Sequence, residues 1–318
     1  FMALIFFVAA LMFGSLLRVG SVGDAVSGTQ TLATGPVWEG WIEPPSYTGK
    51  PALYLNDIPE GPLSVPAGSK VTLRLYGQVG ALTVAETISG RTEDLGAASD
   101  EQQAFVAAKS GRLAIEGENG AAWQITAVAD EAPYVELTGP IEADAMGELS
   151  QPFTAQDDYG VESGTATITL DLDSVERRHG LAVDPDEIAP LVLDLPMPFN
   201  GDRADFEAFF VENLSEHPLA NLPVILSFQV VDAAGQVGES LAEPVVLPGR
   251  RFFQPFAKAI IEQRRDIMWS RSNAPRVAQI MRAISNIPEG LFSNEVTYLR
   301  MRAIIRRLES FEIGTGLT

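Results

Sequence analysis

The sequence predicts a mainly β protein: two tandem immunoglobulin-like β-sandwich domains, preceded by a transmembrane helix and followed by a helical hairpin or small bundle. Three observations lead to this fold class. The first 17 residues carry no charged side chain. Residues 36–248 contain short alternating strands separated by Pro and Gly turns, and residues 249–318 change to a helical period. The chain has no Cys, which removes disulfides and thiolate zinc sites.

The opening segment, FMALIFFVAALMFGSLL, would rise about 26 Å as a helix, slightly less than a hydrocarbon core. We therefore predict that residues 1–18 are the end of a longer transmembrane helix, with residues 1–17 in the lipid bilayer. A cleaved signal peptide is the alternative. It is disfavoured because its apolar region is usually only about 7–15 residues long and follows a basic start. No Lys or Arg occurs between Arg18 and Lys50, which favours an external location for the rest of the chain.

Charge is distributed unevenly along the chain. Residues 19–248 contain 9 Lys or Arg against 36 Asp or Glu, whereas residues 249–318 contain 12 against 6. An acidic region of this kind repels nucleic acid, so we expect no nucleic-acid partner. The basic segment could contact anionic lipid or the acidic part of a neighbouring molecule, which makes a homo-oligomer one candidate assembly.

The first β-sandwich domain is predicted at residues 36–130, after a small, polar and flexible spacer at residues 19–35. Residues 71–76 alternate with period two after the Pro66-Ala67-Gly68 turn. Residues 112–128 contain a strand, an Asn-Gly turn and a second strand, which is a strong signal for a β-hairpin.

The second β-sandwich domain is predicted at residues 131–248. Its expected strands are residues 165–170, 190–195, 224–231 and 244–247. Turn signals recur about every ten residues, which is typical of immunoglobulin-like sandwiches.

The third region, residues 249–318, is predicted to be a basic α-helical segment. Apolar residues recur at helical spacing, and short Pro and Gly connections separate three runs. Asn273 is the expected N-cap of the second helix and Ser293 that of the third. Such runs favour a helical hairpin or a small bundle.

Four segments together resemble a family of uncharacterised alphaproteobacterial proteins, a domain of unknown function. They are WIEPPSYTG (41–49), DDYGV (157–161), HPLANLPVILSFQVVDAAGQVGES (217–240) and FFQPFAKAIIEQRR (252–265). The resemblance implies several N-terminal membrane helices, a β-rich periplasmic region and a helical C-terminal tail. At Leu219 the family would be expected to have a bulkier aromatic residue. The resemblance brings no catalytic residue, cofactor or substrate.

Acidic loops are the first candidate for chemistry. Asp157, Asp158 and Asp232 precede Gly-containing turns and could contribute oxygen ligands to calcium. The spacing of an EF-hand is absent, and Asp also accepts backbone hydrogen bonds in ordinary turns, which is the interpretation we favour. We therefore predict no metal site. The two histidines, His179 and His217, cannot form a three-histidine zinc site.

Interaction surfaces are the second candidate. Trp38, Trp41 and Tyr47 lie close together in the sequence and could stack on sugars or form an interface, although a place in the sandwich core is the simpler interpretation. Arg264 and Arg265, followed by Trp269, could contact anionic lipid headgroups. These are the predicted interaction residues, and we predict no catalytic or cofactor-binding residue, because no P-loop, GxGxxG or GxSxG motif occurs.

The functional expectation is a scaffold or interaction protein of the bacterial envelope, held in the inner membrane with most of the chain in the periplasm. Its expected partners are the bilayer and unidentified envelope proteins. The alternative is a cell-wall or glycan-binding module, or an unrecognised envelope hydrolase.

Overall fold

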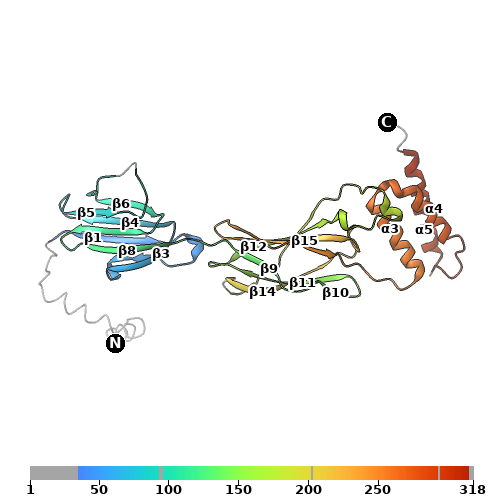
Figure 1. Cartoon of the computed structure of the whole chain (residues 1–318), viewed down its shortest axis with the longest axis horizontal. Helices are drawn as coiled ribbons and strands as arrows, with labels where there is room; N and C mark the ends of the chain where they lie inside the picture. Colours follow the sequence, from blue (N-terminus) through green and yellow to red (C-terminus); the bar gives the residue numbers. More distant parts are fainter. Residues whose placement is uncertain (1–34, 93–95, 202, 293, 315–318) are drawn as a thin grey trace, which may run out of the picture. The chain divides into compact units, whose positions relative to one another are not determined.

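The computed structural model describes residues 35–92, 96–201, 203–292 and 294–314 (Figure 1). The predicted membrane segment, residues 1–18, lies outside these ranges. The chain divides into two compact units, one ending at Ala129 and the other beginning at Asp130, and each is described by itself. The described part of the chain is mainly β, with four sheets and a C-terminal helical part.

The first unit is a β-sandwich of two four-stranded sheets, ordered β2-β1-β4-β6 and β3-β8-β7-β5. Their bounds are β1 Val37–Glu43, β2 Leu53–Tyr54, β3 Gly61–Pro66, β4 Ser69–Tyr76, β5 Leu82–Glu86, β6 Gln102–Ala107, β7 Gly111–Gly117 and β8 Ala121–Val128, with short 3-10 helices η2 Ser46–Thr48 and η3 Leu55–Asp57. Alternate residues of both sheets face one apolar core.

The predicted hairpin is present as β7 and β8, where Leu113 pairs with Trp123. Its turn places Asn119 at φ 62° and Gly117 at φ 130°, conformations that Asn and Gly tolerate. At the core, Trp38 and Trp123 meet edge to face, with ring centroids 5.6 Å apart. The two indoles therefore join the two sheets through one aromatic contact.

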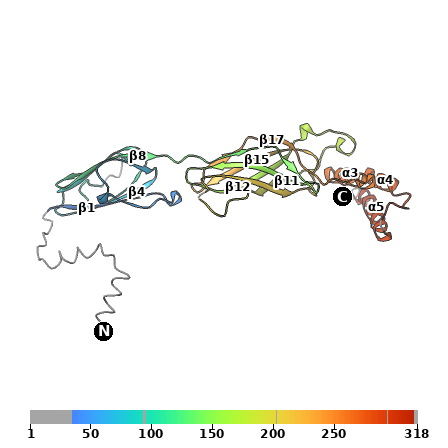
Figure 2. The ribbon, with the colours of Figure 1, turned by 90° about the horizontal axis from the view of Figure 1, so that it is seen from below.

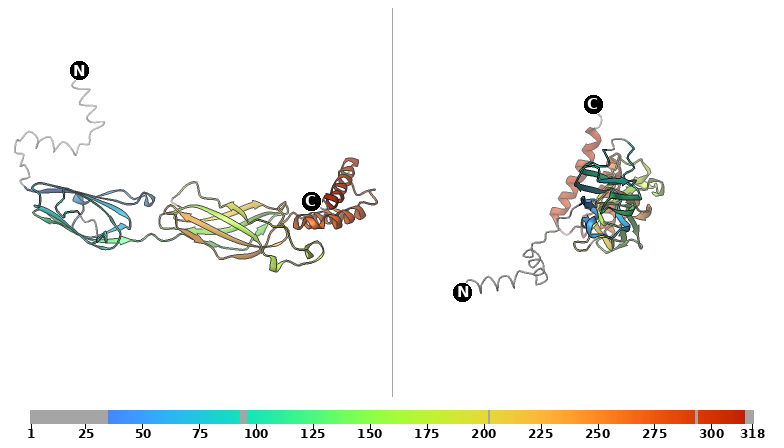
Figure 3. Two further views of the ribbon diagram at one scale, coloured as in Figure 1. Left: turned by 90° about the horizontal axis from the view of Figure 1, so that it is seen from above. Right: turned by 90° about the vertical axis from the view of Figure 1, so that its left-hand side faces the viewer.

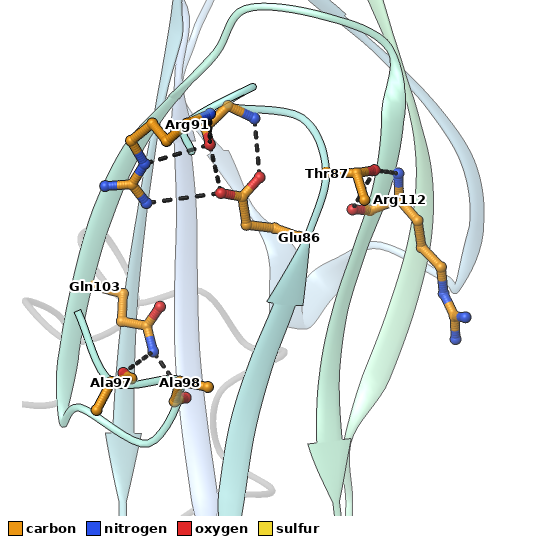
Figure 4. Close-up of polar contacts among 8 residues, drawn as sticks. Glu86, Thr87, Arg91, Ala97, Ala98, Gln103 and Arg112 are labelled. Carbon is orange, nitrogen blue, oxygen red and sulfur yellow. Dashed lines mark hydrogen bonds and ion pairs between the residues drawn. The ribbon is translucent and has the colours of Figure 1, made fainter. Parts of the chain in front are cut away.

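Polar side chains hold the connection between β5 and β6 (Figure 4). Glu86 accepts hydrogen bonds from the backbone N–H and the hydroxyl of Ser89, and Arg91 lies 3.6 Å from its carboxylate. The Gln103 side-chain amide donates to the carbonyls of Ala97 and Ala98. These contacts tie the two ends of this long connection to the sandwich.

The second unit contains another β-sandwich (Figure 2). In one sheet β11 pairs with β9, β10 and β14; the other runs β13-β12-β15, with β16 and β17 both on β15. Their bounds are β9 Tyr134–Leu137, β10 Glu142–Ala143, β11 Glu148–Gln156, β12 Val161–Leu170, β13 Leu191–Asp194, β14 Asp205–Asn213, β15 Pro223–Asp232, β16 Val237–Glu239 and β17 Glu243–Val246.

Three phenylalanines join the sheets of the second sandwich. The Phe228 ring, from β15, meets Phe153 of β11 and Phe210 of β14 edge to face, at centroid distances of 5.3 Å and 5.5 Å. All three side chains are fully buried. The core of this sandwich also contains Trp269, which comes from the helical part.

The helical part consists of α3 Pro255–Trp269, α4 Ala274–Ile284 and α5 Glu295–Gly314, with 3-10 turn η6 Arg271–Asn273 (Figure 3). Val277 and Met281 of α4 pack against Met301 and Ile305 of α5. An ion pair between Arg282 and Glu309 lies beside this contact. Helical pairing of this kind agrees with the predicted helical hairpin or bundle.

The capping predictions had different outcomes. Asn273 precedes α4, but its side chain makes no capping hydrogen bond. Instead, its amide donates to the backbone oxygens of Gly180 and Asp266, so the prediction of a capping side chain was wrong. Ser293 lies outside the described residues. At α5 the side chain of Asn294 accepts from the backbone N–H of Thr297, which is the geometry of an N-cap.

The helical part is attached to the second sandwich through the connection between β12 and β13. This connection contains η4 Leu172–Ser174 and η5 His179–Ala182, and α3 lies against η5. The Trp269 indole N–H donates to the Val183 carbonyl at 2.8 Å. Gly180 lies so close to Asp266 that a methyl group at position 180 would overlap its carboxyl group. The contact between helix and sandwich is thus closely packed.

Candidate functional site

A pocket of about 250 Å³ lies in the second unit, between the β14–β15 connection and α3. Most of its lining residues come from two of the segments that carry the family resemblance, residues 217–240 and 252–265. Basic residues are the majority of its charged lining side chains, with Glu262 as the single acidic one. Its polar and charged lining residues are Ser215, His217, Asn221, Arg250, Lys258, Glu262, Arg264 and Arg265.

The β14–β15 connection forms the wall of the pocket because its turns are closed by local hydrogen bonds. Ala220 N–H donates to the His217 carbonyl, and Leu222 N–H donates to the Leu219 carbonyl, both at 3.0 Å. Leu219 is fully buried in the sandwich core and anchors the turn. Asn221 adopts φ 61°, which Asn tolerates better than most residues.

Gly249 lets the chain pass close to this turn. A Cβ atom at position 249 would overlap the Asn221 amide unless that amide moved. The close approach brings the following residue, Arg250, to the mouth of the pocket. The guanidinium of Arg250 lies over the Phe252 ring, 5.8 Å from its centroid, which steadies the cation.

The cationic side chains are held to different degrees. Arg264 donates a hydrogen bond to the Glu216 carbonyl, which fixes its guanidinium against the β14–β15 connection. Arg265 lies 3.6 Å from Asp266, a carboxylate that also pairs with Arg276 at 2.7 Å. Lys258 is exposed at the rim. The pocket therefore offers several N–H donors around a small volume.

His217 contributes a neutral donor. Its Nδ1 accepts a hydrogen bond from the Leu219 backbone N–H at 3.3 Å, so its proton is on Nε2 when the ring is neutral. Burial lowers the pKa of the His217 imidazole below its ordinary value. The ring is therefore uncharged at neutral pH.

The pocket does not contain a serine-hydrolase triad, although Ser215, His217 and Glu262 all line it. The Ser215 hydroxyl donates to the Asn213 side chain at 2.7 Å, and the Nδ1 atom of His217 is taken by a backbone N–H. A triad needs the hydroxyl bonded to the imidazole and an acid on its other nitrogen. The arrangement therefore suits binding of an anion better than acyl transfer.

The aromatic residues predicted for interaction do not form one surface. Residues three apart on a strand point to opposite faces, so Trp38 faces the core of the first sandwich and Trp41 its outer face. Trp41 is half-buried and packs against Tyr54 with the two rings tilted, and Arg74 lies over its ring. Tyr47 lies half-buried in η2.

The residues predicted for interaction in the helical part also separate. Arg264 and Arg265 line the pocket. Trp269 is buried in the second sandwich and is not exposed at the surface, so its predicted role at an interface was wrong.

The acidic loops close their own turns. Asp157 accepts from the backbone N–H groups of Tyr159 and Gly160, and Asp232 accepts from that of Gln236. Burial raises the pKa of Asp158, and the negative charges of Asp130 and Asp157 raise it further. Within the described ranges, no group of three or more His, Cys, Asp or Glu side chains is placed so that it could hold a metal ion.

The family described as "Domain of unknown function (DUF4175)" matches residues 1–314. The chain belongs to the DUF4175 family. No curated protein matches this DUF4175 chain. A solved structure described as "Structures of Clostridium thermocellum CbhA fibronectin(III)-like modules" aligns with 62% of this chain and 94% of that one, at 10% identity and a TM-score of 0.23. None of the helices described for this DUF4175 protein is long and apolar enough to cross a membrane.

Sequence reasoning missed the edge strand β14 of this DUF4175 protein. Its register with β11 runs from Asp205 to Asn213, and no other strand of the described chain pairs with it. Phe209 and Val211 project outward from it and are 61% and 47% exposed. The alternating pattern DFEAFFVEN was the available signal. An exposed apolar edge of this kind is a candidate protein-binding surface.

Proposed function

We propose that this DUF4175 protein is a scaffold or interaction protein of the bacterial envelope. Residues 1–18 would anchor it in the inner membrane, and two tandem immunoglobulin-like sandwiches would extend into the periplasm. The uncharged opening segment supports the anchor. The absence of Lys and Arg between Arg18 and Lys50 supports the external location of the sandwiches.

The observation that carries this proposal is the open edge of β14. A nine-residue strand with one unpaired edge offers backbone N–H and C=O groups to an extended segment of a partner. Phe209 and Val211 on its outer face would add apolar contacts, which give such pairing its selectivity. The partner is thus expected to present an extended, partly apolar segment.

Affinity capture of the tagged full chain from detergent-solubilised membranes tests the proposal. The double substitution Phe209→Lys and Val211→Lys should reduce recovery of a specific partner about tenfold, because charges on the edge oppose strand addition. Val192→Lys is the matched control. Val192 is 57% exposed on β13, an edge strand of the opposite sheet. Capture of nothing but the protein itself would contradict an interaction role.

The proposed location has its own test. Protease added to intact spheroplasts should digest residues 36–248 without lysis of the cells, because this region would lie outside the inner membrane. A cytoplasmic protein serves as the internal control. Protection of residues 36–248 until the cells are lysed would contradict the periplasmic assignment.

A further inference from the structure

The pocket in the second unit is lined by more basic than acidic side chains. Arg250, Lys258, Arg264 and Arg265 line one small volume, in which Glu262 is the single acidic lining residue, and Asp266 pairs with Arg265. All four belong to the basic segment, residues 249–318, of a chain whose formal net charge is −20. Like charges brought together repel one another, so an anion bound between them would gain energy from all of them.

One of the lining side chains, Arg265, also carries a buried donor. Its Nε atom is closed to solvent and has no hydrogen-bond partner among the described residues. A buried unsatisfied donor costs about 1–3 kcal/mol, and structures usually avoid it. Arg264, by contrast, is fixed by the Glu216 carbonyl, so part of the donor set is already oriented.

We propose that this pocket binds a phosphate group through Arg250, Lys258, Arg264, Arg265 and His217. The site is independent of the β14 edge and of the interaction role proposed above. Arg guanidinium groups form paired hydrogen bonds with phosphate oxygens, and the Nε2–H group of His217 can donate another.

Size and charge favour a phosphate group over a carboxylate. A volume of about 250 Å³ is below the usual range for drug-sized ligands, so the bound group is small. A carboxylate carries one negative charge, whereas a phosphate ester carries about 1.5–2 near pH 7 and three acceptor oxygens. The phosphate could belong to a soluble ester or to a phospholipid headgroup, and the pocket chemistry is the same for both.

Calorimetric titration of the full chain in neutral detergent with inorganic pyrophosphate tests binding. Arg250→Gln combined with Lys258→Gln should weaken binding at least about tenfold, because two charge-assisted contacts are removed. Both side chains are exposed, so the fold should tolerate the change. The matched control, Arg251→Gln with Arg300→Gln, removes the same charge from exposed positions that do not line the pocket.

A second arm distinguishes the source of the phosphate. Native mass spectrometry of the detergent-solubilised chain with added phosphatidate, and separately with phosphatidylcholine, reports lipid adducts. Phosphatidate adducts lost in the pocket variant but kept in the control would assign a lipid headgroup. Pyrophosphate binding without such adducts would assign a soluble ester. No binding of either probe, or equal weakening in both double variants, would overturn the proposal.

Discussion

The two sandwiches differ in how each completes its core. The first is filled by residues of its own unit, and the edge-to-face contact of Trp38 with Trp123 lies entirely within it. The second takes Trp269 from α3 into its core. Because this large core side chain comes from a helix, the stability of the second sandwich depends on the docking of α3. The first sandwich has no such dependence among the described residues.

The largest expected effect comes from truncating the two tryptophans in turn. Trp269→Ala should lower the free energy of unfolding of the second unit by about 3–5 kcal/mol, because a fully buried indole leaves a cavity. Trp123→Ala should do the same to the first unit only. Calorimetry of the full chain with hydrogen exchange of α3 and α4 checks this comparison. Unchanged exchange in α3 after Trp269→Ala would contradict the shared core.

A smaller effect is expected at the contact between helix and sandwich. Gly180→Ala should cost the second unit about 1–3 kcal/mol, because the new methyl group overlaps the Asp266 carboxyl group. Gly35→Ala is the control, since its methyl group would meet only ordinary contacts. Denaturant unfolding measures both, and equal stability of the two variants would show that the contact relaxes freely.

The pH dependence of the stability of the second unit should reveal the protonation of His217. Because burial lowers its folded-state pKa below the unfolded value of 6.5, its contribution to stability is present above that pH. The contribution is lost as the pH falls through the folded-state pKa. The melting midpoint of the wild-type chain should therefore fall more between pH 7.5 and pH 5.5 than that of His217→Gln. His179→Gln is the control and should retain the fall.

The smallest expected effect is at Asp158. Its folded-state pKa is raised, so ionisation at neutral pH opposes folding. Asp158→Asn should raise the melting midpoint by about 1–2 °C at pH 7, because solvent screens most of the repulsion. The gain should vanish below the unfolded-state pKa of 3.8. A gain that persists there would assign the effect to something other than charge.

Local patterns predicted much of this fold. The Asn-Gly turn identified the β7–β8 hairpin, and apolar spacing identified α3 and α4, because these signals depend on neighbouring residues. The parallel pairing of β3 with β8 joins residues about sixty positions apart, and no local signal encodes such a partner. The core position of Trp269 was missed for the same reason.

The candidate site was predicted in part. Arg264 and Arg265 were singled out as a basic pair, but Arg250 and His217 reach the same pocket only through the closed turn of the β14–β15 connection. The separation of Trp38 from Trp41 could have been predicted, since an odd spacing on one strand places side chains on opposite faces. The lining of the pocket could not be predicted, because its residues meet only in the tertiary structure. The alternation of side chains along one strand can be read from the sequence.

The position of the Trp269 side chain in the core of the second sandwich also affects the order of folding during synthesis. Strands β9 to β17 leave the ribosome before α3, so the second sandwich must wait with an unfilled core until residue 269 follows. A chain truncated just after β17 would keep strands β9 to β17 but would lack the Trp269 side chain in its core. Nascent chains of graded length should therefore acquire protease resistance in this unit abruptly, once α3 has emerged.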